Sequence, residues 1–228
     1  MNILAIDTAS RSCSVAVIND DVLMAELTDV SGQTHSRHLM ALVARVVAMS
    51  VKRIGDIDGY AVTRGPGSFT GLRIGISTAK GLAEATGRPL VGVSSLEALA
   101  WPVYQAEATI LPMLDARRKE VYAAGYARRK GVLKPLGPER ALAPEAAAEG
   151  VAGACLLVGD GALAYEARLR AVLGERMQLA LPFQNTIRAS TVAFLARERL
   201  AAAVDERLTL TPRYLRPSYA DEGRHRAR

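Results

Sequence analysis

The chain has 228 residues, of which 50% are hydrophobic and 23% are charged. This composition is typical of a folded globular protein and excludes a disordered chain. No segment reaches the ~18 uninterrupted apolar residues of a membrane-spanning helix, and the N-terminus lacks the basic start of a signal peptide. We therefore expect a cytoplasmic protein without membrane contact. The length allows one large domain or two domains of about 100 residues each.

The first hundred residues alternate strands with helices. This order indicates an α/β layer in which the strand-helix-strand units are parallel and right-handed. Strands are predicted at residues 2–7, 13–19, 21–28, 58–63 and 89–93, and helices at 37–50 and after a glycine turn, where Thr70 is the expected N-cap.

The second half repeats this alternation, which favours a duplicated fold with a cleft between two lobes. The predicted lobes are residues 1–103 and 104–220, where the last part of the second segment can pack back on the first lobe. Residues 221–228 are expected to form a disordered tail. The predicted strands are 109–115, 120–127, 132–135 and 155–159, and the predicted helices are 162–173 and 188–204.

Positive charge is concentrated in the second half of the chain. Residues 1–110 contain 9 Lys and Arg against 10 Asp and Glu, a balance of −1, and residues 111–228 contain 20 against 13, a balance of +7. An anionic partner such as RNA can explain this excess, but arginine-rich helices are also commonly just solvated. Both interpretations stay open.

The cysteines and histidines give no sign of a metal centre. Cys13 and Cys155 each lie in an apolar run typical of a buried strand, so we expect reduced core thiols without a disulfide. His35 and His38 stand three residues apart at a helix start, and nothing at a companion spacing supplies further ligands. The sequence predicts neither a metal site nor a bound cofactor.

Two neighbouring helices carry the candidate interface. The helix at 37–50 is apolar nearly all round, so a partner is expected to cover the side that its own sheet cannot. In the next helix small residues recur at every fourth position, and helical glycines cost roughly 1 kcal/mol each against alanine. Another element of the chain or another protein must approach that ridge closely. The predicted interface residues are Leu39, Leu42, Val43, Val46, Val47, Gly71, Gly75, Ala79 and Ala83.

Candidate cleft residues stand where two apolar strands end in polar turns. Asp7 and Asp115 can flank a cleft and hold a metal-bound phosphate, or they can simply accept hydrogen bonds from loop amides. The glycine turn at residues 65–67 matches neither the dinucleotide motif nor the P-loop spacing. It can place an anion at a helix N-terminus or serve packing alone. The candidate cleft residues are Asp7, Thr8, Ser10 and Asp115.

Motifs spread over most of the chain resemble one known family. They include the run Asp7-Thr8-Ala9-Ser10, residues 65–73, residues 115–122 and the run Pro212-Arg213-Tyr214-Leu215-Arg216. These segments are similar to TsaB, a bacterial family of tRNA threonylcarbamoyladenosine biosynthesis proteins. The resemblance implies a two-lobed, actin-like fold of the Hsp70 and sugar-kinase type, with a mixed sheet in each lobe.

The resemblance also implies a role and partners. TsaB proteins are scaffold or activating subunits that form a heterodimer with the related catalytic subunit TsaD and work with the ATPase TsaE. The complex transfers a threonylcarbamoyl group to the adenosine 3′ of the anticodon in tRNAs that read codons beginning with A. This implies that the chain is a homodimer when alone and contacts tRNA only within the complex.

One segment separates this chain from the catalytic relative, which carries two metal-binding histidines in a V-N-H-L-E-G-H pattern. The corresponding run here is residues 93–99, in which Ser95 and Leu99 stand where those histidines would be. Leucine cannot bind a metal, so the resemblance implies a non-catalytic paralogue. The alternative is a nucleotide-dependent enzyme on the same fold that uses Asp7 and Asp115 with magnesium.

Overall fold

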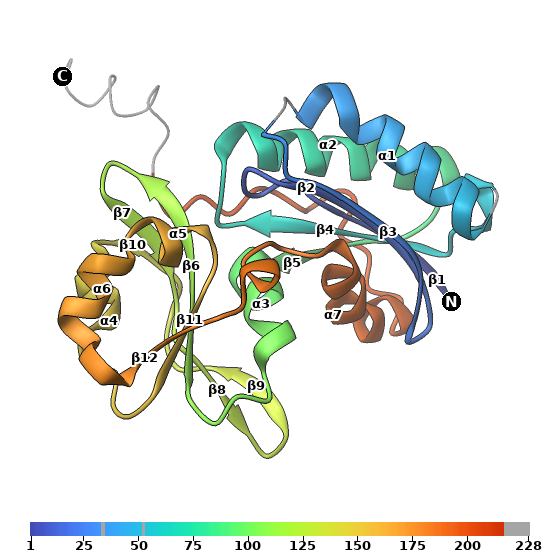
Figure 1. Cartoon of the computed structure of the whole chain (residues 1–228). Coiled ribbons are helices and arrows are strands. Elements are labelled where there is room, and N and C mark those ends of the chain that lie inside the picture. The colour runs from blue at the N-terminus through green and yellow to red at the C-terminus, as the bar shows by residue number, and fades with distance from the viewer. Residues whose placement is uncertain (33–34, 52, 217–228) are drawn as a thin grey trace.

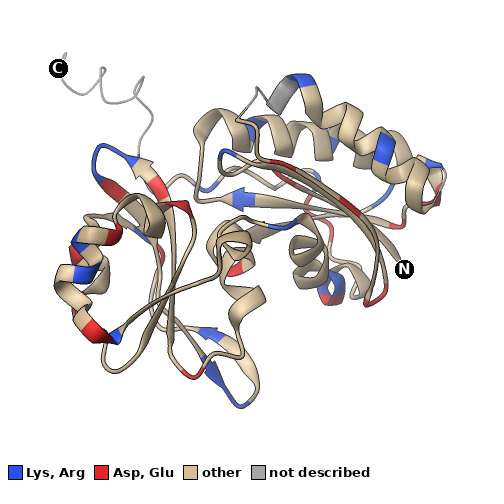
Figure 2. Cartoon of the chain, in the orientation of Figure 1, with Lys and Arg blue, Asp and Glu red and all other residues tan. Residues whose placement is uncertain are grey.

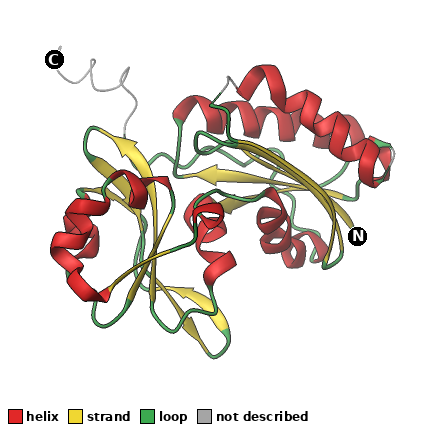
Figure 3. Ribbon diagram, viewed as in Figure 1, coloured by secondary structure: helices red, strands yellow, loops and turns green. Residues whose placement is uncertain are grey.

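The computed structural model describes residues 1–32, 35–51 and 53–216. The tail predicted at 221–228 lies outside these residues. The chain forms two sheets, each covered by helices and joined by short connections (Figures 1 and 3).

The first sheet is mixed, with strand order β3-β2-β1-β4-β5. Strands β3, β2 and β1 are antiparallel, and β1, β4 and β5 are parallel. The strands are β1 (Asn2–Asp7), β2 (Cys13–Asn19), β3 (Val22–Asp29), β4 (Gly59–Gly65) and β5 (Leu90–Ser94). The helices of this half are α1 (His35–Ser50), α2 (Phe69–Thr86) and α3 (Ser95–Ala100), with short 3₁₀ turns at Ile54–Asp56 and Trp101–Val103.

Both faces of the first sheet are buried, because alternate residues of each strand enter different cores. In β1, Leu4 and Ile6 belong to the core under the helix pair α1 and α2, whereas Ile3 and Ala5 belong to the core that includes α7 (Ala189–Ala201) on the opposite face. Figure 1 shows α1 and α2 above the sheet and α7 below it. A strand covered on both faces explains why β1 is apolar almost throughout.

The second sheet repeats the plan of the first. Its order is β10-β7-β6-β11-β12, with β10, β7 and β6 antiparallel and β6, β11 and β12 parallel. A hairpin of β8 (Tyr126–Arg129) and β9 (Val132–Pro135) joins β6 at one residue pair. The remaining strands are β6 (Thr109–Arg117), β7 (Glu120–Ala123), β10 (Arg140–Leu142), β11 (Cys155–Val158) and β12 (Met177–Leu179). The helices are α4 (Pro144–Ala148), α5 (Asp160–Ala164) and α6 (Glu166–Leu173), with 3₁₀ turns at Gly174–Arg176 and Pro182–Gln184.

The structure changes several element predictions. Ser68, not Thr70, caps α2, since its side chain accepts a hydrogen bond from the Gly71 amide. The helix predicted at 162–173 breaks at Tyr165 into α5 and α6, and the strand predicted at 120–127 divides into β7 and β8. Strands β10 and β12 were not predicted, because three-residue strands leave too short a pattern to detect.

The C-terminal part of the chain returns to the first sheet and covers its edge. The Gly92 amide donates to Glu206 Oε2 at 2.7 Å, and Arg199 donates to the Gly92 carbonyl at 2.9 Å. The Glu206 amide donates to the Leu90 carbonyl at 2.7 Å. These bonds protect β5 from pairing with a strand of another molecule. The lobe boundary after residue 103 stays a prediction.

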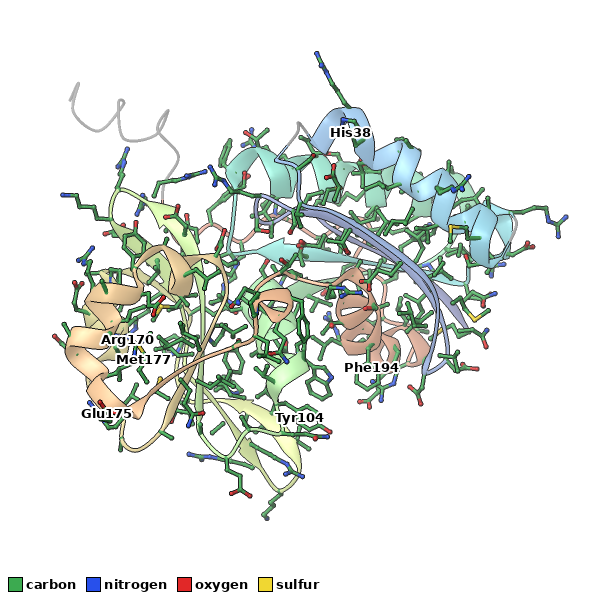
Figure 4. All side chains as sticks on the ribbon, viewed as in Figure 1. His38, Tyr104, Arg170, Glu175, Met177 and Phe194 are labelled. Carbon is green, nitrogen blue, oxygen red and sulfur yellow. The ribbon has the colours of Figure 1, made fainter. Side chains whose placement is uncertain are left out.

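The same C-terminal segment links the two halves of the molecule. The Arg213 amide donates to the Arg64 carbonyl of β4 at 2.7 Å, while its guanidinium pairs with Glu139 at 2.9 Å. Arg216 donates to the Ala116 carbonyl of β6 at 3.3 Å. An aromatic cluster connects the turn after α3 to α7, which packs on the first sheet. The Trp101 ring stacks on the Tyr104 ring, with centroids 4.9 Å apart, and contacts the Phe194 ring of α7, with centroids 5.4 Å apart. Figure 4 labels Tyr104 and Phe194.

Candidate functional site

A cleft of about 940 Å³ lies where the two sheets meet. From the first half it is lined by the turn after β1, which includes Ser10 and Arg11, and by the N-terminal turn of α2. From the second half it is lined by the end of β6, which includes Asp115, and by Asp160 of α5. The carboxyl ends of β1 and β6, the equivalent central strands, therefore face this region from the two lobes.

Asp7 is completely buried and does not line the cleft. Its Oδ1 accepts hydrogen bonds from Thr63 Oγ1 at 2.7 Å and from the Ala9 amide at 3.1 Å. Its Oδ2 has no hydrogen-bond partner among the described residues. Burial raises the pKa of Asp7 from 3.8 to about 7, and the nearby charge of Asp160 acts in the same direction. The side chain is therefore partly protonated at neutral pH.

Asp115 and Asp160 form the carboxylate pair that the cleft exposes. The Asp115 amide donates to Asp160 Oδ1 at 3.0 Å, and Asp115 Oδ1 accepts from the Arg117 amide at 2.9 Å. Burial raises the pKa of Asp160, and the charge of Asp115 adds to the shift. Asp160 is a site residue that was not predicted from the sequence. Its position could have identified it, because Asp160 stands near the carboxyl end of a buried strand, as Asp7 and Asp115 do.

Of the two other predicted cleft residues, Ser10 lines the cleft and Thr8 is buried. Ser10 lines the cleft, and its hydroxyl lies 2.9 Å from that of Ser12. Thr8 is completely buried and donates from Oγ1 to the Gly71 carbonyl at 2.7 Å. The structure thus brings Ser10, Asp115 and Asp160 to one surface and places Asp7 and Thr8 beneath it.

The small-residue ridge of α2 faces the chain itself. A β carbon on Gly71 would lie 2.0 Å from the Thr8 carbonyl oxygen, and one on Gly75 would lie 2.3 Å from Thr8 Oγ1. Ala79 and Ala83 are completely buried in the core under α1 and α2. The expectation that these four residues meet a partner is corrected: the close approach comes from the turn after β1.

The predicted interface residues of α1 also face inward. Leu39, Val43, Val46 and Val47 are between 0 and 6% exposed and pack in the core over the first sheet, with Leu42 partly buried beside them. The outward side of α1 is apolar nevertheless, and its exposed residues are the ones a partner can reach. They are Met40, Ala41, Ala44, Ala48 and Met49, together with the charged residues Arg37 and Arg45.

The positions that correspond to the metal-binding histidines of the catalytic relative lie in a closed core. Ser95 is completely buried, and Leu99 is 1% exposed. A β carbon on Gly159 would lie 2.6 Å from Leu99 Cδ2 and 2.2 Å from the Met113 carbonyl oxygen. Gly159 has a φ of 112°, so glycine is required here by both space and conformation.

Comparison with known proteins agrees with this architecture. A family model described as "TsaD: tRNA N6-adenosine threonylcarbamoyltransferase" matches residues 28–223. The TsaB protein of Bacillus subtilis strain 168 is 32% identical over 224 residues, which cover 97% of this chain and 96% of that one. The solved structure of YeaZ from Pseudomonas aeruginosa has 29% sequence identity and a TM-score of 0.77, covering 94% of this chain and 99% of that one.

A more distant structure supports the fold alone. Component A of (R)-2-hydroxyglutaryl-CoA dehydratase from Acidaminococcus fermentans has 12% sequence identity and a TM-score of 0.53, covering 88% of this chain and 99% of that one. The predicted fold class, an actin-like α/β fold with a mixed sheet in each lobe, is confirmed. In the part of the chain that the structure describes, no helix has the length and apolar character needed to cross a membrane. The chain belongs to the TsaB family of tRNA threonylcarbamoyladenosine biosynthesis proteins, and its sequence also matches the model of the related TsaD family.

Proposed function

We propose that this chain is a non-catalytic subunit that binds a TsaD-type catalytic partner through the outer face of α1. The partner transfers the threonylcarbamoyl group to tRNA, and this chain stabilises or activates it. The proposed further members are a TsaE-type ATPase and, when the partner is absent, a second copy of this chain. A cytoplasmic location is part of the same proposal.

The observation that carries this proposal is the composition of the outer face of α1. Met40 is 52% exposed and Met49 is 57% exposed, and the residues between them on that side are mainly alanine. Methionine adapts to irregular apolar surfaces, and alanine lets another helix approach closely. Arg45 is the charged residue in the middle of this face and Arg37 is exposed in its first turn, so two arginines are the charge that docking would desolvate. Figure 1 shows α1 at the outer surface of the helix layer.

The closed core around Leu99 supports a non-catalytic role. Leu99 packs with Ile110, Leu114 and Val158, which are at most 3% exposed. Catalytic metals need an open coordination position that substrate can reach. Leucine has no ligand atom, and its neighbours occupy the space around it.

The alternative, a nucleotide-dependent enzyme that uses Asp7 and Asp115 with magnesium, receives less support. Asp115 lines the cleft, whereas Asp7 is completely buried and has its pKa raised to about 7. Magnesium prefers ionised carboxylates that also allow it to keep several waters. Asp7 meets neither condition, because it is partly protonated at neutral pH and is completely buried.

Introducing a charge on the outer face of α1 tests the proposal. Ala44→Glu buries a carboxylate if that face binds a partner, so it should abolish co-elution with the TsaD-type subunit in size-exclusion chromatography. It should also lower tRNA modification by the reconstituted complex. Ala171→Glu, at an exposed position on α6, is the matched control and should assemble normally. Both variants should keep the wild-type melting temperature within about 3 °C. Normal assembly of Ala44→Glu would contradict the docking surface.

A further inference from the structure

The hairpin of β8 and β9 carries an unusual concentration of positive charge. Residues 126–135 read YARRKGVLKP and contain four cations and no carboxylate. Arg128, Arg129 and Lys130 are exposed, and the structure records no ion pair or hydrogen bond for these three side chains with any described residue. Figure 2 shows the positive charge of this hairpin at one end of the second sheet. The loops that follow the carboxyl ends of β6 and β11 lie at the opposite end.

Other arginines of the chain contrast with this hairpin. Arg168 pairs with Glu145, and Arg117 pairs with Asp115 at 3.4 Å. The basic turn between β6 and β7, which includes Arg117, is thus partly neutralised. Lys134 of the hairpin is partly balanced as well, because it acts electrostatically on Glu97. Within the hairpin, the unbalanced charge belongs to the three consecutive residues at the tip.

The hairpin holds these residues on a defined support. Lys130 and Gly131 have φ angles of 53° and 81°, which is the pattern of a two-residue type I′ turn. Tyr126 and Leu133 are 4% and 5% exposed and anchor the base, and the Leu136 amide donates to the Gly125 carbonyl at 2.8 Å. The three cations therefore project from a thin, fixed, two-stranded ribbon (Figure 1).

We propose that the tip of this hairpin, Arg128 to Lys130, binds the phosphate backbone of tRNA. Three neighbouring cations repel one another unless an anionic partner balances them, and phosphate groups spaced along a strand do so. A protein partner would need an apolar anchor, but within the described strands β8 and β9 Val132 alone exposes a large hydrophobic side chain, and the exposed Leu136 lies at the base of the hairpin. The choice of tRNA as the polyanion rests on the proposed function. The contact is electrostatic and carries no base specificity. It is available to the chain alone, in contrast to the expectation from the resemblance that tRNA is contacted only within the complex.

The position of the hairpin is compatible with binding of the catalytic partner. Figure 1 shows the β8–β9 hairpin and the outer face of α1 at opposite ends of the molecule. A partner on α1 would therefore leave the hairpin free. This separation also allows the two proposals to be tested independently.

The test compares tRNA binding by the full chain and by R128Q/R129Q/K130Q. An unmodified tRNA transcript is titrated by fluorescence anisotropy between about 50 and 200 mM salt. We expect the affinity of the variant to fall at least about tenfold near 100 mM, and its log-log salt slope to fall by about 2 to 3, since each lost phosphate contact removes roughly 0.7–0.9. The variant R128K/R129K should bind like the wild type, because a phosphate accepts either cation.

A charge-matched control separates position from net charge. R53Q/R88Q/R170Q removes the same three charges from exposed sites elsewhere, one of them Arg170 of α6, which Figure 4 labels. Unlike the tip residues, Arg53 and Arg170 are ion-paired, with Asp56 at 3.0 Å and Glu166 at 2.7 Å. This variant should keep the wild-type salt slope. Equal loss in both triple variants would overturn the proposal, as would unchanged binding by R128Q/R129Q/K130Q. Absence of wild-type binding at about 50 mM salt would overturn it too. A hairpin variant that keeps tRNA binding but loses a protein partner would assign the tip to an acidic protein surface instead. None of these measurements depends on the α1 interface.

Discussion

Thr8 and Gly75 are in such close contact that a β carbon on Gly75 would lie 2.3 Å from Thr8 Oγ1. Thr8 follows β1, and Gly75 lies in the middle of α2, so this contact fixes α2 against the turn that borders the cleft. Gly71 and Gly75 of α2 are therefore explained by packing within the chain.

The first prediction concerns Gly75→Ala. Alanine would add about 1 kcal/mol of helix propensity, but its methyl group must displace Thr8, and such overpacking typically costs about 1–3 kcal/mol. We expect a net loss in the free energy of unfolding, measured by urea titration. Gly75→Leu should unfold the protein rather than yield a folded monomer that cannot dimerise.

Two variants test the cause of this loss. Gly81 lies in the same helix, and nothing lies within 4 Å of its β-carbon position, so Gly81→Ala should stabilise the protein by about 0.5–1 kcal/mol. Thr8→Ala removes the clashing oxygen, so the double variant should recover part of the loss caused by Gly75→Ala. Strict additivity of Thr8→Ala and Gly75→Ala in a double-mutant cycle would show that Thr8 is not the obstacle.

The second prediction concerns the pH dependence caused by Asp7. Its pKa is about 7 in the folded chain and 3.8 ordinarily, so between these values the folded chain binds a proton that the unfolded chain releases. This contribution to the free energy of unfolding is largest below about pH 4 and decreases as the pH rises toward 7. The asparagine of Asp7→Asn does not titrate, so the variant lacks this pH-dependent contribution. Its stability relative to the wild type should therefore increase by about 2–4 kcal/mol between about pH 4 and 8.

Comparison of the two proteins at each pH cancels the other titrating groups, which they share. The amide side chain introduced by Asp7→Asn keeps an oxygen that can accept from Thr63, so the geometry on that side is retained. Asp58→Asn provides a second comparison, because that partly buried residue accepts a hydrogen bond from the Asn2 amide in the same lobe. A difference between wild type and Asp7→Asn that does not change with pH would mean that Asp7 titrates normally.

Much of the fold could be predicted because strand burial leaves a strong local pattern. The strands at 2–7, 13–19 and 132–135 have the predicted bounds, and the first two are buried almost throughout. The orientation of the α2 ridge could not be predicted in this way. A repeat of small residues shows that something approaches closely, but Thr8 lies far before Gly75 in the sequence and its location depends on the folded sheet.

The site was predicted in part for the same reason. The pattern of an aspartate after an apolar strand found Asp7 and Asp115, and the structure adds Asp160 by the same rule. The pattern could not distinguish a buried carboxylate from one that lines the cleft. That distinction depends on the turn after β1, whose Ala9 and Ser10 line the cleft while Asp7 is covered.

The third prediction concerns the positions where the catalytic relative carries histidines. Ser95→His with Leu99→His restores both side chains, but Ser95 is completely buried and Leu99 is 1% exposed beside Gly159. Two imidazoles in this space would be overpacked and would lack hydrogen-bond partners. We expect the double variant to lose more than about 2 kcal/mol of unfolding free energy and to bind no zinc or iron.

Thermal unfolding measures the expected loss of stability. Metal content, together with unfolding in the presence of added metal, measures the expected absence of zinc or iron binding. Leu99→Met conserves volume and should cost less than about 1.5 kcal/mol, which separates the effect of the imidazoles from that of any change at this position. A metal that binds only the folded chain would raise the melting temperature as its concentration rises above the dissociation constant. Stoichiometric zinc together with such a rise would mean that the core beside Gly159 can still open into a metal site. The closed core around Leu99 would then no longer support a non-catalytic role.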